Sequence, residues 1–132
     1  MTAKQYLNRV RRIDKEIDRL LEVKKETSDR LMRITQNYAA DGAQVTKDPH
    51  KYDRLVELES MIDEKIDEMV GLKKEILSTI MRLDDRRQRL VLIEYYIDTK
   101  TFEEIAVDLH YSWRQVHRVH AAALKAVEKI MS

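Results

Sequence analysis

Two long stretches in which apolar residues recur at alternating spacings of three and four constrain the fold more than any other feature. They lie within residues 4–38 and 50–82. This spacing places the apolar side chains along one side of a helix, as in a coiled coil. We expect two long helices, and because the connecting loop at about residues 39–49 is short, they should pair antiparallel. The seam that they share should contain Ile17, Leu20, Ile66 and Met69.

The composition favours an all-α chain. Of the 132 residues only two are Gly and one is Pro, whereas 37% are charged and 43% are apolar. The absence of cysteine excludes disulfides and thiolate metal sites, and it fits a cytosolic protein. No apolar run approaches the ~20 residues of a transmembrane helix, and no secretory signal is visible at the N-terminus. We therefore expect a cytoplasmic protein that is not associated with a membrane.

Residues 101–127 contain two short amphipathic stretches joined by a very short turn. Thr101 and Glu104 have the spacing of a capping box, which marks the start of a helix. Ser112 is suited to cap the next helix, so only about three residues remain for the turn. This arrangement is typical of a helix-turn-helix.

The sequence thus predicts two domains. Residues 1–82 should form the helical hairpin, which resembles a coiled coil. Residues 83–132 should form a small helix-turn-helix domain, whose first helix would extend from Leu83 to Ile97. The fold class is therefore predicted to be all-α, a long antiparallel hairpin followed by a C-terminal helix-turn-helix domain.

A longer pattern extends from Leu83 to Leu124. It begins LDDRRQRLVLIEYYIDTKTFEEIAVDL and continues with a Ser-x-x-x-Val motif and Ala123-Leu124. This pattern resembles region 4 of bacterial sigma factors. The whole chain, with MTAKQYL at its start and a helical hairpin before the helix-turn-helix, resembles the ArpU/RinA-type phage transcription regulators. The resemblance implies a sequence-specific DNA-binding transcription regulator of the phage late-gene activator type. It also implies the cytoplasm of a bacterial host cell, with double-stranded DNA and RNA polymerase as partners.

The exposed positions of the second short helix form the candidate DNA-reading surface. The first turns of such a helix enter the major groove, where Arg, Gln and His hydrogen-bond base edges or phosphates. Arg114 and Gln115 are the candidates for base contacts. Trp113 fits packing beneath the turn better than DNA contact. The full set of candidates on this helix is Ser112, Trp113, Arg114, Gln115, His117 and Arg118.

Arg86 and Arg87 belong to a basic cluster near the start of the predicted C-terminal domain. They could contact DNA phosphates, which position a recognition helix without reading sequence. An interpretation with equal support from the sequence is a solvated helix face, on which these arginines pair with Asp84 and Asp85.

His110 stands in the turn, at a position where many helix-turn-helix turns have Gly. That position usually has a positive φ, which His tolerates better than most other residues with a side chain. We therefore expect His110 to adopt the left-handed conformation.

No catalytic or metal-binding pattern stands out. His117 and His120 are three residues apart, a spacing that can ligate zinc, but no Cys is available and no acid is placed to complete the set. The sequence has no Gly-rich phosphate loop and no Ser, His and Asp grouping at a suggestive spacing. We therefore expect no enzymatic activity, no cofactor and no metal.

Two functions other than transcription regulation remain open. Residues 1–36, 37–81 and 82–132 have net charges of +4, −4 and +1. The total of +1 is low for a DNA-binding protein and favours a protein-interaction module that binds no DNA. A phage small terminase subunit is the other alternative, because those proteins also combine a helix-turn-helix with a hairpin that drives ring assembly.

Apolar residues of the two long helices that lie outside their shared seam would be exposed in a single chain. They favour a homodimer formed through the hairpin.

Overall fold

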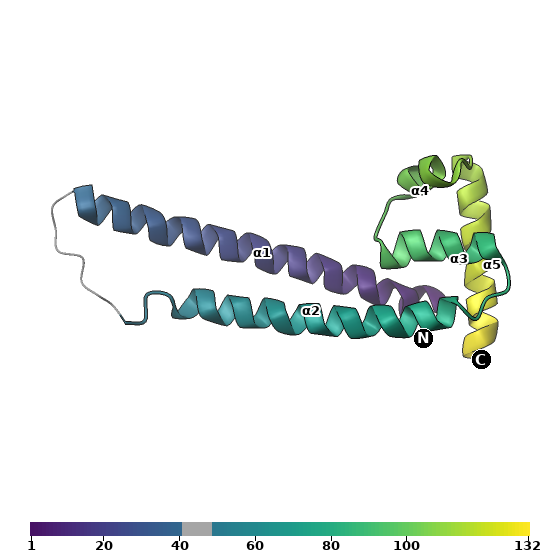
Figure 1. The fold of residues 1–132 in the computed structure, drawn as a ribbon, viewed down its shortest axis with the longest axis horizontal. Coiled ribbons are helices and arrows are strands. Elements are labelled where there is room, and N and C mark those ends of the chain that lie inside the picture. Colours follow the sequence, from purple (N-terminus) through teal and green to yellow (C-terminus); the bar gives the residue numbers. More distant parts are fainter. Residues whose placement is uncertain (41–48) are drawn as a thin grey trace. The chain divides into compact units, whose positions relative to one another are not determined.

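The computed structural model describes residues 1–40 and 49–132, except for the side chains of residues 38–40. Helices account for most of these residues and no strand occurs among them, so the predicted all-α class is confirmed. The predicted loop at about residues 39–49 falls mostly on residues 41–48, which lie outside the described residues. The helices are α1 (Ala3–Ala40), α2 (Asp53–Ile80), α3 (Arg86–Leu92), the π-helical η1 (Ile93–Ile97), α4 (Phe102–Leu109) and α5 (Trp113–Met131) (Figure 1).

None of the described helices combines the length and the apolar character that crossing a membrane requires.

Contacts divide the chain into two compact units. The first, which we call the large unit, combines Met1–Ile13 with Met69–Ser132, and the second, the hairpin unit, is Asp14–Glu68. Both long helices therefore contribute residues to each unit. This division differs from the predicted domains 1–82 and 83–132, which remain a prediction.

In the hairpin unit, α1 and α2 pair antiparallel, as expected. Lys65 Nζ lies 3.0 Å from Glu16 Oε2, and Lys24 Nζ lies 3.3 Å from Glu59 Oε1, so residues late in α2 face residues early in α1. These ion pairs are largely exposed and contribute little stability. Most of the stabilisation comes from the seam, where the buried apolar residues of this unit are Ile17, Leu58 and Ile62.

The structure corrects one predicted seam residue. Ile17 is buried and Leu20 and Met69 are half-buried, but Ile66 is 38% exposed. The neighbouring Lys65 takes the seam position instead, because alternating steps of three and four from Leu58 through Ile62 arrive at residue 65. Its aliphatic stem is half-buried while the ammonium group reaches Glu16.

In the large unit, α3 and α4 both pack on α5 (Figure 1). The centre of this packing is formed by Val91 from α3, Ile105 from α4 and Val116 from α5, all fully buried. The ends of the long helices belong to the same unit, where the hydroxyl groups of Tyr6 and Thr79 lie 3.1 Å apart. The partly buried side chains around the centre are Tyr95, Phe102, Ala106, Leu109, Tyr111 and Val119.

The turn between α4 and α5 has the local structure that the sequence predicts. Thr101 and Glu104 form a complete capping box at the start of α4, and Ser112 Oγ accepts a hydrogen bond from Gln115 N (3.0 Å) at the start of α5. His110 has φ 58° and ψ 38°, which confirms the left-handed conformation. Tyr111 N then donates to Ala106 O (3.0 Å), which closes the turn.

We expect His110→Gly to raise the free energy of unfolding by a few tenths to about 1 kcal/mol. A side chain in the left-handed region is strained, and the greater freedom of Gly in the unfolded chain offsets part of the gain. Urea unfolding followed by circular dichroism measures the change. Glu103→Gly at an exposed position in the first turn of α4 is the control and should lower the free energy of unfolding. Equal losses for both variants would contradict the strain at His110.

Candidate nucleic-acid interface

The first two turns of α5 present two free arginines. Ser112 caps the helix, and Val116 is buried beneath it, so Arg114 and Arg118 lie on the opposite side and are exposed. Within the described part of the chain neither guanidinium has a hydrogen bond or an ion pair. Both are therefore available to bind an anion outside the protein.

Two lysines that were not among the residues predicted from the sequence extend this surface. Lys125 and Lys129 are exposed and follow Arg118 after two and three helical turns, so they lie on the same side of α5. The signal was present in the sequence as the spacing of four basic residues along one helix. We call Arg114, Arg118, Lys125 and Lys129 the basic stripe. The buried residues of α5 are Val116, Ala123 and Val127, on the opposite side of the helix.

The acidic residues of α4 and α5 are not part of the basic stripe. Glu128 is the only acidic residue of α5, and its Oε1 accepts a hydrogen bond from Ala3 N at 2.7 Å. The exposed side of α4 presents Glu103, Glu104 and Asp108. The basic stripe is therefore the side of this helix pair that an anion would approach.

The other candidates in the first turns of α5 are less available than the two arginines. Trp113 and His117 contact aromatic rings, and Gln115 is half-buried. Trp113 is 55% exposed, but its ring centroid lies 3.9 Å from that of His117, one helical turn away. His117 also contacts Phe102 (centroids 4.3 Å apart), and its buried Nε2 has no hydrogen-bond partner among the residues that the structure describes. Gln115 is half-buried. His117 thus packs between two aromatic rings, which favours Arg114 and Arg118 as the groups that reach a ligand.

Arg86 and Arg87 are exposed at the start of α3 and form no ion pair in the described residues. Asp85, their predicted partner in the alternative interpretation, is the N-cap of α3 instead. Its Oδ1 accepts hydrogen bonds from Arg87 N (2.8 Å) and Gln88 N (3.3 Å). The pairing of these arginines with Asp84 and Asp85 is therefore not found, and both remain available to phosphates.

A partly buried hydrogen bond joins η1 to α5. The hydroxyl group of Tyr96 lies 2.8 Å from His120 Nε2, and burial raises the pKa of Tyr96. Burial lowers the pKa of His120 to about 4, with smaller contributions from His117 and Lys4. Both groups are therefore uncharged at neutral pH. No group of three potential metal ligands occurs among the described residues.

Arg11 connects the beginning of α1 to the same region. Its Nη1 donates to Tyr95 O (2.7 Å) and to Lys100 O (3.4 Å), and its guanidinium lies 4.2 Å from the centroid of the Tyr95 ring. The Tyr95 ring in turn stacks on Phe102, with centroids 4.3 Å apart. Cation–π and charged hydrogen bonds thus hold η1 and the segment before α4 against α1.

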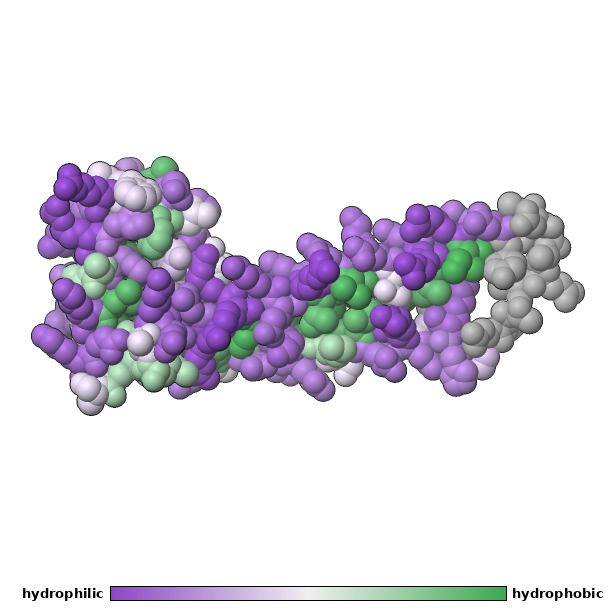
Figure 2. Space-filling model, turned by 180° about the vertical axis from the view of Figure 1, so that it is seen from behind, coloured by the Kyte–Doolittle hydropathy of each residue, from purple (hydrophilic) through white to green (hydrophobic). Residues whose placement is uncertain are grey.

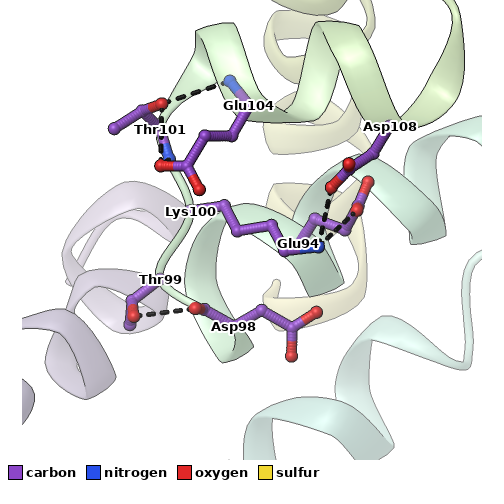
Figure 3. Close-up of polar contacts among 7 residues, drawn as sticks. All are labelled: Glu94, Asp98, Thr99, Lys100, Thr101, Glu104 and Asp108. Atoms are coloured by element: carbon purple, nitrogen blue, oxygen red, sulfur yellow. Dashed lines mark hydrogen bonds and ion pairs between the residues drawn. The ribbon is translucent and has the colours of Figure 1, made fainter.

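Lys100 holds α4 against η1 (Figure 3). Its Nζ lies 2.7 Å from Asp108 Oδ2 and 3.0 Å from Glu94 Oε1. The hydrogen bonds to Asp108 and Glu94 raise the pKa of Lys100, while burial raises the pKa of Glu94. The hydrogen bond with Lys100 lowers the pKa of Asp108. Because the three groups come from η1, the following loop and the end of α4, their contacts fix where the turn before α5 begins.

The pKa of His120 predicts acid sensitivity. In the unfolded chain this imidazole has a pKa of about 6.5, so unfolding binds a proton between pH 6.5 and 4. The contribution of His120 to stability should therefore be complete above pH 6.5 and be lost as the pH falls towards 4. His120→Gln keeps a hydrogen-bonding side chain that does not titrate. Urea unfolding at pH 7 and at pH 4.5 should show a smaller acid-induced loss for the variant; equal losses would contradict the shifted pKa.

Comparison with known proteins gives one result. A family model described as "Protein of unknown function (DUF1492)" matches residues 35–128, which include α2 to α4 and most of α5. Searches of curated proteins and of solved structures return no match.

Proposed function

The chain belongs to the DUF1492 family, and we propose that it is a transcription regulator that binds double-stranded DNA with α5 as its recognition helix. The resemblance to sigma region 4 and to the ArpU/RinA-type regulators supports a role as a phage late-gene activator in the bacterial cytoplasm. On that model RNA polymerase is a second partner.

The observation that carries the proposal is the basic stripe on a basic unit, because its four side chains form no ion pair within the described residues. The large unit has 15 Lys and Arg against 9 Asp and Glu, a net charge of +6. The hairpin unit has 10 against 15, a net charge of −5. The low total charge, which favoured a protein-interaction module, therefore averages over two units of opposite sign. A basic face is the electrostatic requirement for binding a phosphate backbone.

The geometry of α4 and α5 supports the same function. Only three residues, 110–112, separate the two helices, as in a helix-turn-helix, whose second helix enters the major groove by its first turns. Arg114 and Arg118 lie in those turns, while the acidic exposed side of α4 would be repelled by phosphates. We therefore assign base contacts to Arg114, and base or phosphate contacts to Arg118. Lys125 and Lys129 are assigned to the backbone.

Arg114→Ala should weaken specific binding by about 1–3 kcal/mol and relax specificity at one base position. The target is first identified by selecting the full chain on random duplex DNA, and affinities are then measured by fluorescence anisotropy. The control is Arg30→Ala, an exposed arginine of the hairpin unit, which should leave affinity unchanged. The proposal fails if selection enriches no sequence, or if both Arg114→Ala and Arg118→Ala bind the selected DNA as the native chain does.

Arg86→Ala and Arg87→Ala should weaken binding to all sequences alike, because phosphate contacts carry no sequence information. Each lost contact should lower the slope of log affinity against log salt concentration by about one. Titrations at several salt concentrations on selected and random DNA measure both effects. A loss restricted to the selected sequence would instead show that these arginines read bases.

A further inference from the structure

The start of α5 presents an exposed aromatic ring. Trp113 directly follows the Ser112 cap and is 55% exposed. Hydrophilic side chains predominate on the side of the large unit that Figure 2 shows. Among the exposed apolar side chains of the whole unit, that of Trp113 is the largest. Packing beneath the turn, which the sequence favours for this residue, would cover more of the ring, so the structure leaves the indole open to a ligand.

Neighbouring rings hold the indole in place. The centroid of the Trp113 ring lies 3.9 Å from that of His117, which in turn lies 4.3 Å from that of Phe102. The ring of Phe102 stacks on Tyr95. Rings from η1, α4 and α5 thus form a continuous series that ends at Trp113. The contact with His117 occupies one face of the indole and restrains it, so binding through the exposed part costs little further conformational entropy.

Trp113 lies beside the two arginines of the proposed DNA-reading surface. Residues one turn apart are neighbours on a helix, so Trp113 and His117 form one row and Arg114 and Arg118 form the adjacent row. Both rows belong to the first two turns of α5, and the first turns of a recognition helix enter the major groove. On the proposed function, the indole therefore enters the groove together with Arg114.

We propose that Trp113 reads a thymine by packing its indole against the C5 methyl group in the major groove, an inference that rests on the proposed DNA binding by α5. The thymine methyl is the apolar group that base edges present in this groove, where the other groups are hydrogen-bond donors and acceptors. An apolar ring that loses water on binding gains most against that methyl group. Arg114 reads a neighbouring base by hydrogen bonds, so two kinds of contact define adjacent positions of the target.

Replacing thymidine by deoxyuridine tests the proposal, because this change removes only the C5 methyl group. The target of the full chain is first selected from random duplex DNA. Each of its thymidines is then replaced singly, and affinities are measured by fluorescence anisotropy of labelled DNA. At one position the native chain should lose affinity about fourfold, which is the effect of burying one methyl group.

Variants assign that loss to the indole. Trp113→Ala should bind the thymidine and deoxyuridine targets equally at this position, and Trp113→Phe should keep most of the difference because it keeps an apolar ring. Trp113→Phe also lacks the indole N–H, so it separates the methyl contact from a hydrogen bond. Val107→Ala is the matched control, an apolar residue of α4 that is 74% exposed, and it should respond as the native chain does. Circular dichroism should show unchanged helix content in all three variants.

Fluorescence provides a second measurement on the native chain. Trp113 is its only tryptophan, so the emission reports on this position directly. Saturating target DNA should quench or shift the emission, because the contact removes water from the indole. Unchanged emission overturns the inference, as does a target on which no deoxyuridine replacement lowers affinity, or an equal response of the native chain and Trp113→Ala. These results leave DNA binding by α5 standing, whereas a selection that enriches no sequence overturns both.

Discussion

Burial of one side of α5 is the constraint on which the rest of the large unit depends. A helix has one side to bury, and in α5 Val116, Ala123 and Val127 fill it. The basic stripe on the opposite side is exposed as a direct result. The surrounding interactions serve to keep that side fixed: Arg11 holds η1 and the loop, and Lys100 holds the end of α4. A candidate ligand surface thus follows from packing before any ligand is considered.

Local signals made the α4–α5 turn predictable from sequence. The capping box and the Ser112 cap are satisfied within three residues of themselves, and the left-handed position of His110 follows from the short turn between them. The seam of the hairpin was harder to predict, because Lys65 and Ile66 are adjacent. Whichever of the two is assigned to the seam, the other seam positions of the helix are still occupied by apolar residues. Apolarity alone selects Ile66; the structure selects Lys65, whose stem fits the seam. The packing of His117 could not be predicted for a related reason, since it depends on Phe102, fifteen positions earlier in the sequence.

Charge could not be assigned correctly from linear segments. Residues 1–13 contain four basic residues and no acidic one, and the sequence pattern assigns them to the first long helix alone. Contacts assign them to the large unit, beside α5, where Glu128 accepts a hydrogen bond from Ala3 N. This grouping gives the large unit its basic character. Sequence patterns identify helices and caps, but only tertiary contacts show which charges act together.

The large unit is discontinuous in sequence, and the hairpin unit is a single excursion between Ile13 and Met69. Such an inserted segment can change in length without a change in the residues of the large unit that precede and follow it. Removing seven residues from each of its helices would keep the seam in phase, because both helices follow the same seven-residue period. Evolution can therefore lengthen or shorten the arm in whole heptads. The residues that hold α5 in place would be under separate selection from those that set the reach of the hairpin.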